Sequence, residues 1–234
     1  MTEPRTSETT LLAEDFLLLL FDAKSGVFHG EGMTLFHTLA GAILAELALD
    51  GRVEIDAALS WRGREVRAVA GDPPEDPLLR ETWDRVSQKP TDVQSLILEI
   101  GPPLRASVVD RLVESGQIRR EKRKFLGLIP TTALVDAGTP RRATLMTAVR
   151  GVLIDGAAPD VRSGALVALL SASGALPALH REIPWSGAVY TRAKEIQRGD
   201  WGAAEAGEAV ARTTAALIAS SLFVTVTLPA LRSD

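Results

Sequence analysis

The chain contains no cysteine and few aromatic residues. Its 234 residues include one Tyr, six Phe and four Trp. Without cysteine the protein can form neither a disulfide nor a thiolate metal site, and the composition fits a reducing compartment. The cores of β proteins draw heavily on aromatic and β-branched side chains, so the scarcity of aromatic residues favours helices. With 46% hydrophobic residues the chain can bury a continuous core, and we expect a mainly α fold.

We predict neither a secretory signal nor a membrane span from the sequence. Met1 to Thr10 is polar, with no basic start followed by an apolar stretch, so we expect a cytoplasmic protein. The segment from Thr213 to Leu231 is uncharged, but six of its residues are Ser or Thr. Such a segment is more typical of a buried terminal helix that continues into an extended tail at Val224 to Val226 than of a transmembrane helix.

Charge is distributed unevenly along the chain. The net charge is −4, yet residues 1–100 hold eighteen acids against nine bases, a balance of −9. Residues 119–150 hold eight bases against Glu121 and Asp136, a balance of +6. One segment of the chain can therefore face an anionic surface while the rest faces solvent.

Hydrophobic periodicity, interrupted by Gly and Pro residues, predicts helices and two β-hairpins. We expect them to form one compact helical domain at 11–234, after a flexible tail at 1–10. Hairpins are expected at Arg52–Ala70 and Ile118–Asp136, the second one projecting. Gly101-Pro102-Pro103 is expected to end one short helix. The predicted helices are Leu11–Asp22, Leu35–Leu49, Leu78–Val86, Val93–Ile100, Leu104–Ser115, Val161–Ser171, Ala188–Gln197, Ala203–Ser221 and one that opens at Thr139-Pro140, with Thr139 as its cap.

Several segments are similar to the Golgi phosphoprotein 3 family, in the family's order and at similar spacing. The strongest match is Leu39 to Arg52, with the sequence LAGAILAELALDGR. Leu11 to Leu19 and the Lys-x-Gly turn after it also match. Further matches are Thr91–Ser95, Arg111–Gly116, Phe125–Leu128 and Thr191–Glu195. The resemblance extends over about residues 10–220 and is carried by the collinear order of these segments.

This resemblance implies a non-enzymatic, mainly helical protein that binds phosphatidylinositol 4-phosphate in a basic pocket and uses a projecting hairpin for membrane insertion or self-association. At four pocket positions the chain keeps only Arg105. Glu31 replaces a family Trp, and Ala40 and Pro102 replace family Arg residues. Binding of a phosphorylated headgroup needs several convergent donors, so we expect this pocket to be weaker than in the family.

The basic segment around the second hairpin is the candidate lipid-binding surface, because basic side chains beside an apolar tip suit an anionic interface. A hairpin whose Phe125 and Leu128 pack on the protein's own core remains an alternative, as does a surface ion pair for Arg105. The candidate tip residues are Phe125, Leu126, Leu128 and Ile129. The candidate lipid-binding residues are Arg105, Arg111, Arg119, Arg120, Lys122, Arg123, Lys124, Arg141 and Arg142.

Catalytic, metal, cofactor and nucleic-acid sites are not predicted. His29, His37 and His180 are far apart in sequence and none has the spacing of a metal-ligand motif. The acidic pI of about 5.5 and the absence of aromatic residues within the basic run disfavour a nucleic-acid partner. The sequence therefore leaves two hypotheses: a peripheral membrane protein that binds anionic phospholipid, or a soluble scaffold that self-associates through the hairpin.

Overall fold

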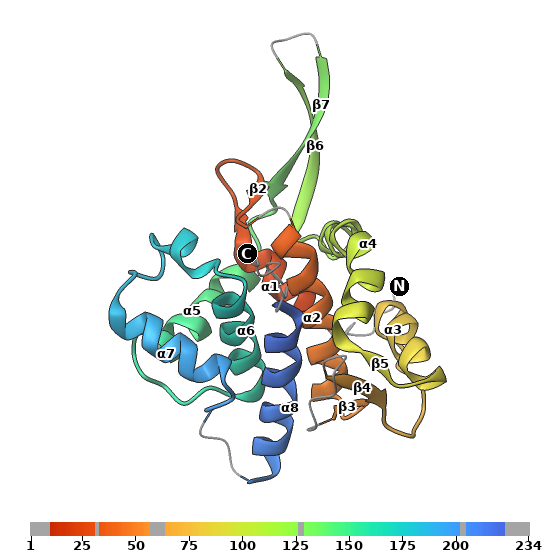
Figure 1. The fold of residues 1–234 in the computed structure, drawn as a ribbon. Coiled ribbons are helices and arrows are strands. Elements are labelled where there is room, and N and C mark those ends of the chain that lie inside the picture. Colours follow the sequence, from red (N-terminus) through yellow and green to blue (C-terminus); the bar gives the residue numbers. More distant parts are fainter. Residues whose placement is uncertain (1–9, 31–32, 57–63, 126–128, 202–204, 223–234) are drawn as a thin grey trace, which may run out of the picture.

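A computed structural model describes residues 10–30, 33–56, 64–125, 129–201 and 205–222 and shows a mainly helical fold, as the sequence predicts (Figure 1). The helices are α1 (Leu12–Leu20), α2 (Met33–Leu49), α3 (Pro77–Gln88), α4 (Val93–Glu114), α5 (Arg141–Leu153), α6 (Val161–Ala172), α7 (Gly187–Gln197) and α8 (Glu205–Leu222), with a 3-10 helix η1 (Leu176–Leu179). The strands are β1 (Phe21–Asp22), β2 (Val27–Phe28), β3 (Val53–Ile55), β4 (Glu65–Ala68), β5 (Thr91–Asp92), β6 (Ile118–Phe125) and β7 (Ile129–Asp136).

Helix α1 lies at the centre of the fold, and every one of its residues is buried. Helices α2, α4, α5 and α6 pack against it, and α8 packs along α2 (Figure 1). A helix that is apolar on nearly all sides is stable only when other elements cover it, which explains the run of leucines in α1. The predicted helix at Leu11–Asp22 ends slightly early, because Phe21 and Asp22 pair with Phe28 and Val27 as strands.

Side-chain caps define where several helices begin. Asp92 accepts a hydrogen bond from the backbone N–H of Ser95 at 2.9 Å, and Asp160 accepts one from Ser163 at 2.7 Å. Such caps satisfy backbone donors that the first turn leaves open. The predicted cap at Thr139 is wrong: Pro140 occupies the cap position of α5, and the Thr139 hydroxyl forms a 2.5 Å hydrogen bond with Oε1 of Gln117.

Helix α4 is continuous, so the predicted break at Gly101-Pro102-Pro103 is wrong. Both prolines are exposed, and so are Leu98 and Glu99, whose carbonyl groups lose their usual donors four residues later. Water can solvate those carbonyls on the exposed face. The buried face continues through the proline pair, with Leu96, Ile97, Ile100, Leu104 and Val108 all in the core.

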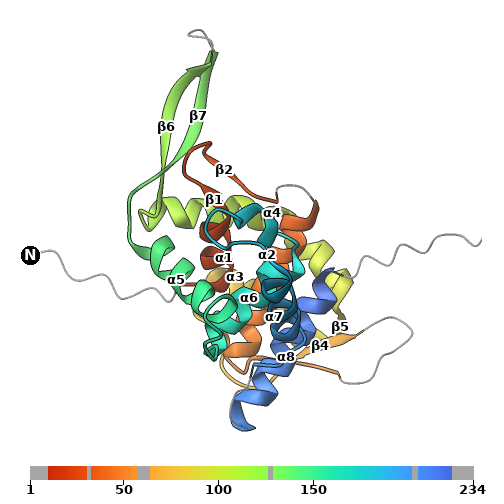
Figure 2. The same ribbon diagram turned by 90° about the vertical axis from the view of Figure 1, so that its left-hand side faces the viewer.

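Both predicted hairpins are present, and the second leaves the helical body. Strands β3 and β4 pair in the first, and β5 adds a third strand to that sheet. Strands β6 and β7 pair from Ile118 with Asp136 to Phe125 with Ile129. In both views this pair extends away from the helices (Figure 1, Figure 2). No described helix is long and apolar enough to cross a membrane. The tail at Val224 to Val226 and residues 1–9 lie outside the described residues.

The turn between β1 and β2 supports the base of the projecting hairpin, and Gly26 makes that contact possible. Gly26 has a φ of 71°, and a Cβ at this position would clash with the backbone carbonyl of Leu134 in β7. The contact therefore requires glycine for two reasons, the backbone conformation and the close approach.

We expect Gly26→Ala to destabilise the fold more than Gly116→Ala, measured as free energies of unfolding in urea. Gly116 has the same φ of 71°, but no atom lies within 4 Å of the place that a Cβ would take, so its substitution carries only the conformational cost of about 1–2 kcal/mol. The clash with Leu134 should add about 1–3 kcal/mol at Gly26. Equal losses in the two variants would show that the turn does not press against β7.

Candidate functional site

The exposed part of strand β6 carries most of the predicted basic site. Arg119, Arg120, Lys122 and Arg123 are all exposed, with Glu121 as the acid among them. Successive residues of a strand point to opposite faces, so these bases occupy both faces of the hairpin. The side chains of Lys124, Phe125 and Ile129, and all of Leu126 and Leu128, lie outside the described structure.

Two of these bases have acidic neighbours near the surface. Arg120 pairs with Asp110 of α4, and Arg123 lies 3.5 Å from Glu121. All four side chains of these pairs are about half exposed, so the pairs contribute little to stability. Each base can therefore leave its acid for another anion. Arg119 and Lys122 form no ion pair within the described ranges. Strand β6 therefore offers cationic groups to solvent.

The base of the hairpin is fixed to the body. Ile118 is fully buried, and Leu134 packs against the core on the opposite strand. Gln117, which precedes β6, accepts the Thr139 hydrogen bond and also receives the backbone N–H of Ala137 on its carbonyl at 3.2 Å. The charged middle of the hairpin is thus held at a defined position relative to the helices.

Arg105 lies on the same end of the protein as the hairpin. Its guanidinium carbon is 5.6 Å from the centroid of the Phe28 ring in β2, within range of a cation–π interaction. The β1–β2 turn that carries Phe28 also contacts β7 through Gly26. Sequence periodicity alone did not establish this proximity, because it arises from packing between elements that are far apart in the chain.

The other positions at which the resemblance implies a headgroup pocket supply no cation among the described residues. Ala40 is fully buried within α2, and Pro102 is an exposed residue of α4 about one turn before Arg105. Glu31 lies outside the described residues. Arg105 is therefore the basic residue that these positions supply in the described structure.

Three other predicted lipid-binding arginines are engaged inside the protein. Arg111 lies 2.6 Å from Glu14 and 2.8 Å from Asp76. Arg142 forms a bidentate ion pair with Glu182, with hydrogen bonds of 2.6 and 2.9 Å. Burial opposes the charge of Arg111, but the hydrogen bonds and charges of Glu14 and Asp76 raise its pKa. The hydrogen bonds from Arg142 to Glu182 likewise raise the pKa of Arg142.

Arg141 belongs to a buried charge network that also contains Arg162. Arg141 Nε donates to Asp15 at 3.0 Å. Arg162 contacts the second oxygen of Asp15 at 2.9 Å and Glu46 of α2 at 2.9 Å. Glu46 also accepts the backbone N–H of Leu12, at the start of α1. This network joins α1, α2, α5 and α6.

The sequence contains one signal for this network but does not reveal its centre. The acids Glu14, Asp15 and Glu46 lie on otherwise apolar helices, where a carboxylate is more often paired than catalytic. Arg162 lies at the start of a distant helix, and no local pattern connects it to them. Within the described ranges, no group of three or more acidic or His side chains is arranged to hold a metal ion.

With this geometry established, comparison with known proteins identifies the family. A family model described as Golgi phosphoprotein 3 (GPP34) matches residues 12–213, which is most of the chain. The chain belongs to the Golgi phosphoprotein 3 family. A search of curated proteins found no match. The resemblance seen in the sequence is thus confirmed, and the family match includes α1, the hairpin and Arg105 of this Golgi phosphoprotein 3 family member.

Replacing Asp15 by Asn should destabilise the protein by about 3 kcal/mol, because two arginines then lose a shared buried carboxylate. The control is Asp84→Asn, which removes the same charge from an exposed position on α3 and should change stability by about 0.5 kcal/mol or less. Urea unfolding of both variants measures the difference. Equal stabilities would show that the network does not hold the helices together.

Glu46 should give the network a specific pH dependence. Burial raises the pKa of Glu46 above its ordinary value of 4.5, against the opposing charge of Arg162. The folded state then binds more protons than the unfolded state between these two pKa values, so this carboxyl favours folding less as pH rises. The free energy of unfolding of the wild type, minus that of Glu46→Gln, should increase as pH is lowered towards 4.5. A difference that decreased over this range would contradict the assignment.

Proposed function

We propose that this protein is a non-enzymatic peripheral membrane protein that binds anionic phospholipid through the hairpin end. The observation that carries the proposal is the set of exposed bases on β6, which extends away from the helical body (Figure 2). Membership of the Golgi phosphoprotein 3 family supports it. The bases of the hairpin end are Arg105, Arg119, Arg120, Lys122 and Arg123.

Electrostatics favours an orientation with the hairpin towards the membrane. Each base close to an anionic bilayer contributes about 1 kcal/mol, and the attraction decays over about 10 Å at 0.1 M salt. The whole chain carries a net charge of −4, so its remaining surface is repelled by the same bilayer. A projecting hairpin brings its cations within the screening length while the acidic surface stays farther away.

Selectivity for phosphatidylinositol 4-phosphate is a narrower proposal that rests on Arg105. A phosphorylated headgroup favours several converging donors, and Ala40 and Pro102 supply none. We therefore propose that the protein binds anionic bilayers in general and prefers phosphatidylinositol 4-phosphate only weakly. The bases of β6 act as a diffuse charge and do not require one headgroup shape.

A self-associating scaffold is a second candidate, favoured by the topology of the hairpin. Strands β6 and β7 form a two-stranded sheet, so each has an outer edge with no strand partner in the described structure. Such edges can pair with another chain. The consecutive bases of β6 oppose pairing at that edge, because like charges on adjacent strands repel. The edge of β7 is the better candidate for a contact between copies.

We expect Lys122→Glu with Arg123→Glu to weaken binding to phosphatidylserine vesicles at least roughly thirtyfold, since two attractions of about 1 kcal/mol are lost. The matched control reverses Lys89 and Arg198, two exposed bases outside the hairpin, with the same change in net charge. Co-sedimentation at low and physiological salt measures binding. A parallel series with phosphatidylinositol 4-phosphate tests selectivity.

Equal loss in the two double variants would refute a role for the hairpin. Absence of vesicle binding by the wild type, together with oligomers in sedimentation analysis that dissociate when 121–133 are deleted to remove most of the β7 edge, would favour the scaffold. A strong preference for phosphatidylinositol 4-phosphate would contradict the narrower proposal.

A further inference from the structure

A cavity of about 460 Å³ lies beside the base of the hairpin, apart from the pocket positions at Ala40, Pro102 and Arg105. Three segments that are distant in sequence form it: the β1–β2 turn, the end of β7 with the start of α5, and the chain around the end of η1. Phe21, Ala178 and Leu179 supply apolar wall. A cavity of this size accommodates a small organic molecule.

The carboxylates that line this cavity accept hydrogen bonds from neighbouring groups of the protein. Glu182 uses both oxygens to accept hydrogen bonds from Arg142. Asp22 accepts from the backbone N–H of Lys24 at 2.9 Å and from the Ser25 hydroxyl at 2.9 Å, and these bonds lower its pKa. Asp136 accepts the backbone N–H of Gly138 at 3.0 Å. Each carboxylate offers about four acceptor positions, so these groups can accept further bonds, and their charges balance those of Lys24, Arg142 and Arg181 in the lining.

The cationic and imidazole groups of the same cavity have fewer hydrogen-bond partners than its carboxylates. The Lys24 ammonium and the Arg181 guanidinium form no hydrogen bond or ion pair within the described residues. His29 also lines the cavity, and His180 uses one ring nitrogen, Nδ1, at 3.2 Å from the Pro177 carbonyl. Lys24 and Arg181 are therefore the charged donors of the lining that no described acceptor occupies.

We propose that this cavity binds a phosphomonoester, with Lys24 and Arg181 as the main contacts and His29 and His180 as further donors. A phosphomonoester carries about −1.5 to −2 charges at neutral pH and has only acceptor oxygens on its outer face, which matches the unused donors. The apolar wall and the cavity volume leave space for the group that bears the phosphate. The source is either a soluble phosphorylated metabolite or the headgroup of a lipid.

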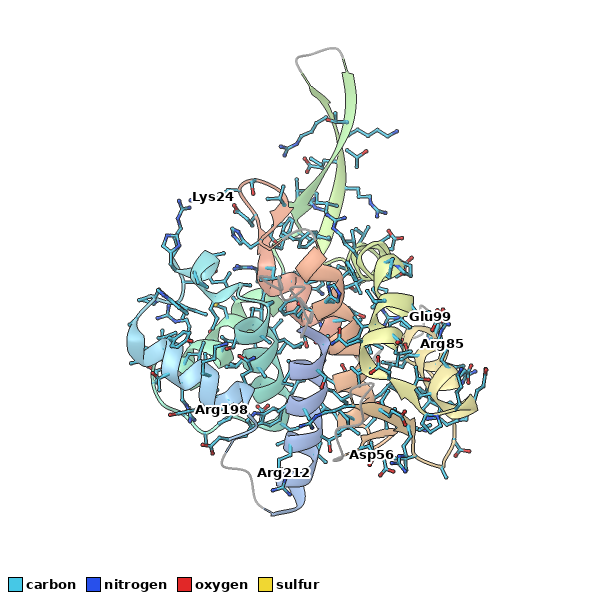
Figure 3. All side chains as sticks on the ribbon, viewed as in Figure 1. Lys24, Asp56, Arg85, Glu99, Arg198 and Arg212 are labelled. Carbon is cyan, nitrogen blue, oxygen red and sulfur yellow. The ribbon has the colours of Figure 1, made fainter. Side chains whose placement is uncertain are left out.

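The position of Lys24 allows both sources. Figure 3 shows Lys24 on the hairpin end of the protein, whereas Arg198 lies at a distance from it on the helical body. Lys24 therefore places one edge of the cavity lining on the side from which β6 projects. Binding of a soluble phosphomonoester does not depend on the proposed membrane function, so the two proposals can fail separately.

The test compares Lys24→Ala with Arg181→Ala in one chain against the matched control Lys89→Ala with Arg198→Ala. Calorimetric titration with glycerol 3-phosphate measures the soluble source. Co-sedimentation with phosphatidic acid vesicles, compared with phosphatidylserine vesicles, measures the lipid source, because only phosphatidic acid carries a phosphomonoester. We expect the cavity variant to lose at least about tenfold in affinity and the control to retain wild-type binding.

The outcomes separate the sources and the two proposals. Binding of glycerol 3-phosphate that survives Lys122→Glu with Arg123→Glu but weakens in the cavity variant supports a soluble ligand. A preference for phosphatidic acid that disappears only in the cavity variant supports a lipid headgroup. No phosphomonoester binding by the wild type in either assay, or equal binding by the cavity and control variants, overturns the proposal.

Discussion

The fold depends on the way that Arg162 and its acidic partners position α1. An apolar helix surrounded by other apolar helices can slide or rotate with little loss of buried area, because hydrophobic contact is not directional. Asp15 and Glu46 remove that freedom, since each binds Arg162 at hydrogen-bond distance from a different helix. The acids in the first turn of α1 also suit its helix dipole. Desolvation offsets much of the attraction in such a network, so its main effect is on the geometry of the helices.

This network and the other internal ion pairs determine which cations remain available for function. Arg111, Arg141 and Arg142 neutralise acids of α1 and of the segments packed around it, so their charges are committed to the body. The bases of β6 have no buried acids to neutralise. Like charges that follow one another along a strand cost free energy, and here the anchored hairpin base holds them in place. Locally unfavourable groups that a stable scaffold holds in place are typical of functional sites. The internal charge network stabilises the scaffold on which the proposed membrane surface is held.

The sequence predicted those features that depend on local pattern. The helices follow from apolar spacing, and the β6–β7 hairpin follows from the turn and strand signals between Ile118 and Asp136. Two predictions failed because tertiary structure overrode the local pattern. The exposed side of α4 tolerates Pro102 and Pro103, and Thr139 binds Gln117, which no local rule for caps contains. The sequence also could not separate the arginines that form internal ion pairs from those that are exposed. A single Arg in the sequence does not reveal a partner such as Glu182 on another element.

The proposed surface and the proposed cavity share the anchored base of the hairpin. Gly26 brings the β1–β2 turn against β7, and the same turn carries Lys24 into the cavity lining. Asp136, the last residue of β7, lies in that lining as well. A phosphomonoester in the cavity would therefore contact the same turn and the same end of β7 that fix the base of the hairpin.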